Sequence, residues 1–341
     1  MIVPIFLPHL GCGERCTYCD QDIITDIGEV NLEARIAGVL ASRKGSFEVG
    51  LYGGNIFGLT PPVLRRLFSC FYSEKHRITG FRISTKPVPL NPEVIEILKG
   101  NRVAIIELGI PTFNDTTLNV LNRGHTAEDL RRAVSVLKSE GFGVALQVMT
   151  GLPDETMADI RETAENIVCL APSYIRIYPL VVLAGTRLAD TFTARRFEPI
   201  FFEEVVERTV FIYLAALKAG VKTVKMGLTD NEVIKERIIG GSYHPAFGSI
   251  VKSTAFYLAV MANLSKHSLH GEVLVTLNGR DIPHLIGHKR ANLKRFRERG
   301  VLITWETSER PPDTFVLACG NKAIDGDIFD GLDPAVSAID G

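Results

Sequence analysis

The chain has few cysteines and hardly any tryptophan for its length, and it carries almost no net charge. Its 341 residues include six cysteines and one tryptophan, and the formal net charge at pH 7 is −1. A near-zero charge excludes a global field that would draw the whole protein to nucleic acid or to a membrane surface. We find no apolar run of the roughly 18 residues that a membrane span needs, and no signal-peptide pattern at the N-terminus. These absences predict a cytoplasmic protein without membrane contact.

The cysteines are too unevenly spaced for a disulfide framework. Cys12, Cys16 and Cys19 lie in one loop with the spacing C-x3-C-x2-C, directly after an apolar run, and the other three are isolated. Three thiolates leave one position of a metal centre open, whereas a closed zinc site or an iron–sulfur cubane normally takes four protein ligands. Two interpretations follow from the residues: an iron–sulfur cluster with one iron free for a non-protein ligand, and a zinc site that borrows His9.

Strand patterns alternate with helix patterns over the first two thirds of the chain. Apolar runs typical of strands cover residues 2–7, 47–52, 80–85, 103–110, 143–149, 174–178 and 223–228. Between two of them, Thr126 and Asp129 form an approximate capping box at the start of an amphipathic helix. The alternation predicts an α/β fold with a parallel β/α barrel, partial or closed, whose chemistry lies at the C-terminal ends of the strands.

The composition changes after about residue 240, and we predict four segments. These are a β/α barrel over residues 1–230, a helical and loop extension over 231–270, a small basic α+β module over 271–319 and a loose acidic tail over 320–341. The module should contain strands at 272–277, 302–306 and 314–318 and one helix over 282–299. The tail is glycine-rich and carries five Asp against one Lys, a composition that disfavours packing.

Polar and glycine-rich motifs follow the predicted strands in order. They are Tyr52-Gly53-Gly54-Asn55, Ser84-Thr85-Lys86, Glu107-Leu108-Gly109-Ile110-Pro111, Asn122-Arg123-Gly124-His125, Gln147-Val148-Met149, and Arg176 with Tyr178 and Gly185-Thr186. Paired glycines let a backbone approach a ligand closely. Hydroxyls and cations bind carboxylates, and a guanidinium matches the shape of a carboxylate. The motifs therefore predict a ligand site at this edge of the sheet.

Together with the three-cysteine loop, these motifs resemble the radical S-adenosylmethionine (SAM) superfamily. They are similar to those of the radical SAM domain of the Elongator catalytic subunit and of oxygen-independent coproporphyrinogen oxidase-like proteins. The resemblance covers roughly residues 1–230. It implies a [4Fe–4S] cluster on Cys12, Cys16 and Cys19, with SAM chelated to the open iron. One-electron reduction by a donor such as flavodoxin or ferredoxin would cleave SAM to a 5′-deoxyadenosyl radical, which abstracts hydrogen from a substrate. The ordered motifs favour this cluster over the zinc site.

The resemblance also implies residues that contact SAM, although it names no further catalytic residue. The expected contacts are Gly53, Gly54, Asn55, Ser84, Lys86, Glu107, Arg123, Gln147 and Met149. Asn55 stands where relatives often have Glu, so we expect its backbone to matter. Pro111 replaces a Gln of relatives, which removes a side-chain hydrogen bond. Glu107 has two interpretations, a paired polar group that faces the barrel interior or a structural residue.

The predicted basic module contains a motif of its own. Residues 280–299 hold seven Lys or Arg against two acidic residues. The run 286–290 resembles the Ile-Gly-x-x-Gly turn of a KH domain, which clamps single-stranded nucleic acid, with Arg290 at the second glycine. Gly287, Lys289, Arg290 and Lys294 are therefore candidate nucleic-acid contacts. The alternative is a solvated amphipathic helix that buries Leu285, Leu293 and Phe296.

The sequence favours a radical SAM enzyme whose substrate is an RNA, in particular tRNA. One alternative is the same chemistry on a small metabolite or cofactor precursor, bound in the barrel mouth near Tyr178, Tyr243 and His244. A second alternative is a non-enzymatic iron–sulfur protein.

Overall fold

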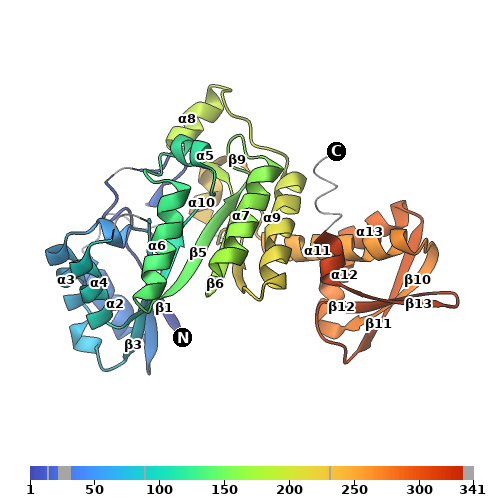
Figure 1. Ribbon diagram of the computed structural model, residues 1–341, viewed down its shortest axis with the longest axis horizontal. Helices are drawn as coiled ribbons and strands as arrows, with labels where there is room; N and C mark the ends of the chain where they lie inside the picture. Colours follow the sequence, from blue (N-terminus) through green and yellow to red (C-terminus); the bar gives the residue numbers. More distant parts are fainter. Residues whose placement is uncertain (14, 22–31, 88–89, 230–231, 333–341) are drawn as a thin grey trace.

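The largest unit of the protein is an open, all-parallel sheet. The computed structural model describes residues 1–13, 15–21, 32–87, 90–229 and 232–332. Seven strands pair in the order β1-β2-β3-β4-β5-β6-β8. They are β1 Ile2–Phe6, β2 Phe47–Tyr52, β3 Ile78–Thr85, β4 Val103–Gly109, β5 Gly143–Thr150, β6 Tyr174–Pro179 and β8 Thr223–Met226. Because β1 and β8 are the two edges of this order, the barrel is partial, and the predicted fold class is confirmed (Figure 1).

Helices between the strands cover one face of this half-barrel (Figure 1). They are α2 Leu32–Ala41, α3 Pro61–Ser69, α4 Pro92–Gly100, α6 Ala127–Ser139, α7 Met157–Leu170 and α9 Phe202–Lys218, whereas α5 Asp115–Val120 and α8 Arg187–Thr193 lie at the C-terminal edge of the sheet (Figure 1). Side chains alternate along a strand, so Ile106 and Leu108 of β4 are buried in the apolar core, and Glu107 points to the opposite face. We call that opposite face the inner face. The predicted capping box of α6 is present, and its buried stripe is as expected.

The chain after β8 joins the barrel to the C-terminal module. It forms α10 Glu232–Arg237, β9 Ile238–Gly241 and the long helix α11 Phe247–Lys266. β9 pairs antiparallel with β7, Val181–Leu183, a small sheet that the sequence did not suggest. By length and composition α11 resembles a membrane span, but 67% of its most apolar window is buried. It packs on α9 of the barrel and on α12 of the module, as a core helix does.

The module is a four-stranded sheet with two short helices. Its elements are β10 Gly271–Asn278, α12 Ile282–Ile286, α13 Ala291–Glu298, β11 Val301–Ser308, β12 Thr314–Cys319 and β13 Lys322–Asp327. The order is β11-β10-β12-β13, with β10 and β11 parallel and the other pairs antiparallel. The three strands predicted here are present, with small shifts in their ends.

The prediction of one helix over residues 282–299 is wrong. The helix breaks at Gly287, whose φ is +80°, and Lys289 and Arg290 also have positive φ angles of 50° and 65°. Asn292 occupies the space next to Gly287 and donates a hydrogen bond to the carbonyl of His284 at 2.9 Å. The apolar pattern runs on through the break because both helices bury their apolar side chains in the same core.

The prediction of a loose tail from residue 320 is also wrong for residues 322–331. β13 pairs with β12 along its whole length, and a 3-10 helix, η5 Ile328–Gly331, follows it. The acidic residues have structural partners: Asp327 and Asp330 form a capping box, and Asp330 accepts a hydrogen bond from buried Asn263 at 2.7 Å. Composition alone missed these contacts because it reports neither the pairing of β13 with β12 nor the bond from Asn263, which lies 67 residues from Asp330. Residues 333–341 of the predicted tail lie outside the described residues.

Candidate functional site

The cysteine loop lies at the C-terminal edge of the half-barrel and is locked onto the turn after β2. Backbone hydrogen bonds join residues 7–10 to residues 52–55 at 2.6–3.0 Å. Gly54 faces this contact: a Cβ atom added there would lie 2.6 Å from the carbonyl oxygen of Leu10 and 2.9 Å from that of Leu7. Gly53 has a positive φ of 87°. The paired glycines therefore let the two loops touch, and three backbone hydrogen bonds fix the turn after β2 to the cysteine loop.

Gly54→Ala is expected to reduce iron incorporation sharply, because the new methyl group would push the cysteine loop off the turn. The matched control is Gly13→Ala in the same loop, where an added Cβ would meet no atom within 4 Å. Iron and acid-labile sulfide per chain after anaerobic reconstitution measure the effect. Equal iron content in the two variants would contradict the packing role of Gly54.

Asn55 holds three strand-end loops together. Its Oδ1 accepts hydrogen bonds from the Thr85 hydroxyl at 2.8 Å and from the Lys86 backbone N–H at 3.1 Å. Its Nδ2 donates to the carbonyl of Gly11 at 3.2 Å, and the residue is buried. The side-chain amide is thus engaged within the protein, which agrees with the expectation that only the backbone of Asn55 faces a ligand.

The three loop cysteines are free thiols in unlike electrostatic surroundings. Burial raises the pKa of Cys16, but the charges of Arg123 and Lys86 outweigh it, and the pKa lies below its ordinary value. Burial raises the pKa of Cys19 to about 12, and a charge on Cys16 adds to this rise. Burial also raises the pKa of Cys12. Since the thiolate is the metal-binding form, Cys16 is prepared as a ligand, and the other two need the positive charge of a metal centre.

Arg123 reaches the cysteine loop from the turn before α6. Its Nη1 lies 3.1 Å from the Sγ of Cys16 and 3.2 Å from the hydroxyl of Tyr18, and its Nη2 donates to the carbonyl of Gly109. The residue is 6% exposed. The guanidinium that the sequence assigned to the SAM carboxylate therefore lies against the cluster loop, where it stabilises a thiolate.

His9 does not complete a zinc site. Its Nε2 accepts a hydrogen bond from the backbone N–H of Gln21 at 2.9 Å, so this nitrogen serves the loop itself. Within the described ranges, no three His, Cys, Asp or Glu side chains surround one metal position. A zinc ion would gather all its ligand atoms within about 2.0–2.3 Å of itself, whereas the thiolates of a cubane bind separate irons. Three cysteines without a histidine fit the iron–sulfur cluster.

A buried carboxylate organises the inner face of the sheet below this loop. Glu107 is 1% exposed and accepts hydrogen bonds from the Ser84 hydroxyl at 2.9 Å and the Tyr174 hydroxyl at 3.2 Å. Its Oε2 also lies 3.0 Å from the Nε of Arg176. Of the two interpretations of Glu107, the structure confirms the paired polar group that faces the barrel interior.

Further polar side chains continue along the inner face. Arg82 forms a two-pronged ion pair with Glu48 at 2.6 and 3.0 Å. The Nε2 of Gln147 lies 3.5 Å from the Oε1 of Glu107. On β8, burial and the nearby charge of Arg176 lower the pKa of Lys225. The inner face therefore offers charged and hydrogen-bonding groups from β2 to β8, beside the C-terminal edge that carries the cysteines.

The remaining residues predicted for the site do not form one cluster. Met149 packs in a small apolar cluster with Tyr18, and its backbone N–H donates to the carbonyl of Pro111 at 2.9 Å. Tyr178 lies near Arg176 on the inner face, Tyr243 packs beside Ile234, and His244 contacts Phe202. The three residues proposed for a small substrate in the barrel mouth thus have three different surroundings.

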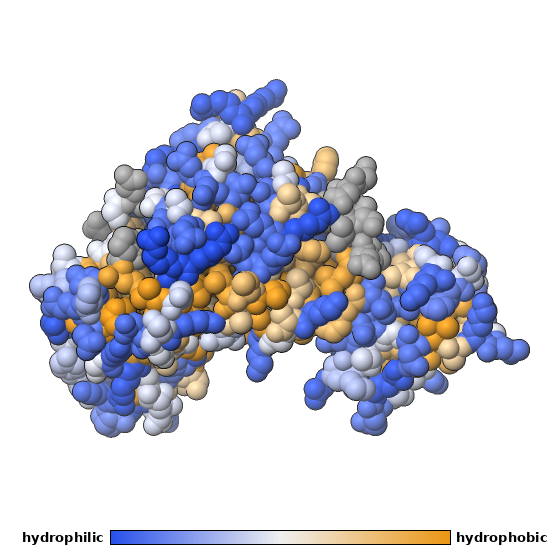
Figure 2. All heavy atoms as spheres, in the orientation of Figure 1, coloured by the Kyte–Doolittle hydropathy of each residue, from blue (hydrophilic) through white to orange (hydrophobic). Residues whose placement is uncertain are grey.

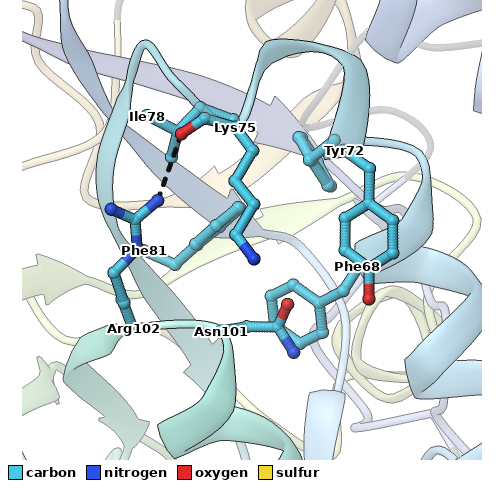
Figure 3. Close-up of a pocket in the computed structure, with 8 residues that line it drawn as sticks. Phe68, Tyr72, Lys75, Ile78, Phe81, Asn101 and Arg102 are labelled. Atoms are coloured by element: carbon cyan, nitrogen blue, oxygen red, sulfur yellow. Dashed lines mark hydrogen bonds between the residues drawn. The ribbon is translucent and has the colours of Figure 1, made fainter.

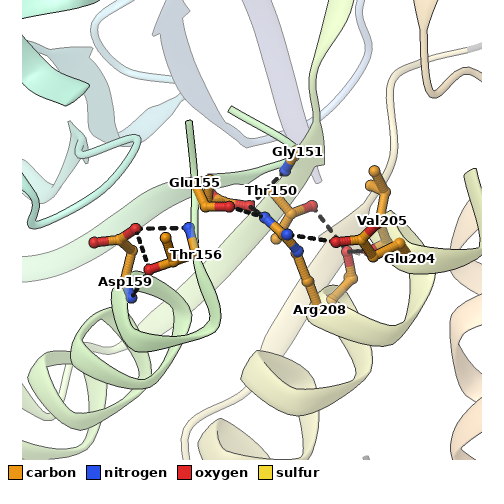
Figure 4. A network of polar contacts seen from close by, with 9 residues as sticks. Thr150, Gly151, Glu155, Thr156, Asp159, Glu204, Val205 and Arg208 are labelled. Carbon is orange, nitrogen blue, oxygen red and sulfur yellow. Dashed lines mark hydrogen bonds and ion pairs between the residues drawn. The ribbon is translucent and has the colours of Figure 1, made fainter. Parts of the chain in front are cut away.

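Sequence reasoning missed a buried ion pair at the same edge of the sheet (Figure 4). Arg208 of α9 lies 3.1 Å from Glu155 before α7, and it also pairs with Glu204. Glu155 in turn accepts the backbone N–H of Gly151 at 2.8 Å. The Glu155–Arg208 pair fixes the loop after β5, and it has no local sequence signal because 53 residues separate the two side chains.

A small hollow is present near the N-terminal ends of β3 and β4 (Figure 3). It is lined by Phe68, Phe71, Tyr72, Lys75, Ile78, Phe81, Asn101 and Arg102. These residues belong to the end of α3, the segment that leads into β3, the first half of β3 and the turn before β4, away from the cysteine loop. In a parallel β/α fold the chemistry lies at the opposite, C-terminal ends of the strands, so we assign the hollow no part in the site. The surface over α5 and α8, at the C-terminal edge, is mainly hydrophilic (Figure 2).

The predicted basic turn projects from the module. Lys289, Arg290 and Lys294 are exposed, and Gly287 is buried at the base of the turn. Arg295, the next cation of the run, instead stacks on Tyr257 at 3.7 Å from the ring centre. Leu285 and Phe296 are fully buried. The amphipathic packing and the exposed basic turn are thus both present, so the two alternatives for this segment do not exclude each other.

Two models of protein families match most of this chain. The model of the radical SAM superfamily matches residues 6–167, and that of the radical SAM C-terminal domain matches residues 172–255. The chain is 28% identical over 180 residues to a tRNA uridine(34) acetyltransferase of Methanocaldococcus infernus, which is 52% of this chain and 33% of that protein. It is 27% identical over 180 residues to the heme chaperone HemW of Lactococcus lactis, which is 50% of this chain and 47% of that one.

A solved structure, archaeal Elp3 from M. infernus with an N-terminal deletion, shares the fold. The TM-score is 0.57 at 16% sequence identity, over 97% of this chain and 75% of that chain. The chain thus spans at most about half the length of the two curated relatives named above. Their activities are properties of longer proteins.

Proposed function

Since this chain belongs to the radical SAM superfamily, we propose that it carries out radical SAM chemistry on an RNA, with tRNA as the substrate class. The protein is a radical SAM enzyme, and the cofactors of this superfamily are a [4Fe–4S] cluster and SAM. When bound, they supply a radical that removes a hydrogen atom from the substrate. The protein holds the cofactors, orients the substrate and excludes water. The electron donor is proposed to be a flavodoxin or a ferredoxin.

Different residues at the C-terminal edge hold the cluster, contact SAM and position the site. Cys12, Cys16 and Cys19 hold the cluster, and the positive charges of Arg123 and Lys86 favour the thiolate of Cys16. The proposed SAM contacts are Gly53, Gly54, the backbone of Asn55, Ser84, Lys86, Gln147 and Met149. Glu107 and Arg123 are left to position this site, because their side chains are occupied by protein partners.

The observation that carries the RNA proposal is the exposed basic turn. Gly287 gives the turn its left-handed backbone, and Lys289 and Arg290 project from it beside the start of α13. Backbone N–H groups and cations at such a turn bind phosphates. The chain has almost no net charge, so this local group provides attraction that the whole molecule lacks. The tRNA-modifying relative supports the same substrate class.

Reversing both charges, Lys289→Glu with Arg290→Glu, is expected to weaken tRNA binding and to leave substrate-free SAM cleavage intact. Each lost phosphate contact should also reduce the slope of log affinity against log salt by about one. Anisotropy titrations at several salt concentrations measure both effects. The matched control reverses Arg297 and Lys322, two exposed cations of the same module outside the turn. Equal binding by both double variants would refute the role of the turn.

A small heme-related or other metabolite is the second candidate substrate. The relative named as a heme chaperone and the polar inner face around Arg176 and Lys225 support it. A small substrate bound on the inner face would stimulate SAM turnover equally in the natural protein and in the turn variant, because the turn lies in the module.

A further inference from the structure

One aromatic side chain is more exposed than any other large hydrophobic residue among the described ranges. Phe201, the N-cap residue of α9, is 82% exposed. Single exposed hydrophobic residues are common on protein surfaces, so exposure alone indicates nothing. We therefore consider which residues lie next to Phe201.

On one side Phe201 adjoins the edge that carries the cofactor site. Its neighbour Ile200, and Val205 one turn into α9, pack against Gly151 at the end of β5. A Cβ added to Gly151 would lie 2.9 Å from Val205 and 3.9 Å from Ile200. The Glu155–Arg208 pair holds the same loop in place (Figure 4). Phe201 therefore stands on a rigid support at the C-terminal edge of the barrel.

On the other side a row of rings leads from α9 to the basic turn. Phe202 lies 6.1 Å from His244 between ring centres, and His244 lies 5.0 Å from His288 in a nearly perpendicular arrangement. His288 is the residue before Lys289. The row of rings thus connects Phe202, the residue after Phe201, with the residue that precedes the exposed cations of the turn.

The turn is held in one position. Asn292 is buried and donates hydrogen bonds to the carbonyls of Ser253 in α11 and His284 in α12. These bonds support two successive left-handed residues, Lys289 and Arg290, although neither is glycine. Such backbone strain persists where the surroundings enforce it, and it is concentrated at functional sites.

The charges near Phe201 favour an uncharged base of a nucleic acid over a charged phosphate. Glu203 lies in the first turn of α9 and repels phosphates from it, whereas the charge of Glu204 is paired with Arg208. A nucleobase is uncharged and stacks on an aromatic face regardless of its identity. The cations of the turn attract the phosphates instead. We propose that Phe201 is a stacking platform for a nucleobase of single-stranded RNA whose phosphates lie on Lys289 and Arg290. This inference rests on the proposed RNA function.

Phe201→Ala tests the platform in the full-length protein. With a fluorescently labelled single-stranded RNA oligonucleotide, the variant is expected to bind about 5- to 100-fold more weakly, while Phe201→Tyr stays near the natural affinity. The salt slope should stay unchanged, since no phosphate contact is lost. Tyr72→Ala is the matched control, because it removes an aromatic side chain that is 57% exposed in the hollow of Figure 3.

An oligonucleotide of the same length with abasic sites isolates the stacking. The natural protein should lose affinity for it, and Phe201→Ala should bind the abasic and the normal RNA alike. Equal affinity of Phe201→Ala and the natural protein, together with a loss in the turn variant, would overturn this inference and leave the proposed function standing. RNA binding by neither the natural protein nor any variant would overturn both.

Discussion

Alanine at Cys12, Cys16 and Cys19 is expected to abolish cluster formation, whereas the natural chain should take up about four irons on anaerobic reconstitution. The reason is electrostatic as well as steric. Cys16 is already inclined to ionise beside Arg123, and the thiols of Cys12 and Cys19 ionise only when a metal centre offsets their burial. Without these sulfurs, the loop lacks the thiolates that an iron–sulfur cluster needs. Iron analysis and the broad visible absorbance of the cluster measure the loss.

The matched control replaces the other three cysteines, Cys70, Cys169 and Cys319, with alanine. They are free thiols outside the loop, so this variant should keep its iron. It should also keep slow reductive release of 5′-deoxyadenosine from SAM without substrate, which the loop variant should lose. Iron retained in the loop variant, with loss in the control, would remove the basis for the cluster ligands.

Replacing Glu107 with leucine should lower the free energy of unfolding by about 3–5 kcal/mol, because one side of a buried ion pair is removed. Arg176 would lose the carboxylate at 3.0 Å, and the hydroxyls of Ser84 and Tyr174 would lose their acceptor. Burial and the Glu107 charge raise the pKa of Tyr174, so its hydroxyl stays protonated and needs that acceptor. Urea denaturation of the apo-protein measures the change.

Glu107→Gln separates the structural role from a role in cofactor binding. It keeps an acceptor for the hydroxyls but loses the charge, so we expect a smaller loss of stability and an unchanged affinity for SAM. The exposed pair of Arg65 and Glu93 provides the control, since Glu93→Gln should change stability by less than about 1 kcal/mol. Loss of SAM binding by Glu107→Gln at undiminished stability would make Glu107 a cofactor ligand.

Much of the barrel could be predicted because its signals are local. The bounds of β2 agree with the predicted strand, and the Thr126 capping box is visible in four consecutive residues. The two errors in the module concern turns, which apolar periodicity and composition do not report. An apolar pattern that continues across Gly287 cannot reveal a break enforced by Asn292, and the acidic composition of residues 320–331 cannot reveal a strand that pairs with β12.

The sequence by itself determined that the three cysteines and the polar motifs follow strands, and therefore lie at one edge of the sheet. Cysteine spacing and the order of the strand-end motifs are properties of neighbouring residues, and a parallel sheet brings all strand ends to one edge. Only the tertiary structure decided the partners of the charged groups. The guanidinium of Arg123 and the thiol of Cys16 are 107 residues apart in the sequence. Glu107 and Tyr174, which share a hydrogen bond, are 67 residues apart. A buried charge is unstable unless an opposite charge or a hydrogen bond compensates its lost hydration. Only the folded chain brings that partner within reach.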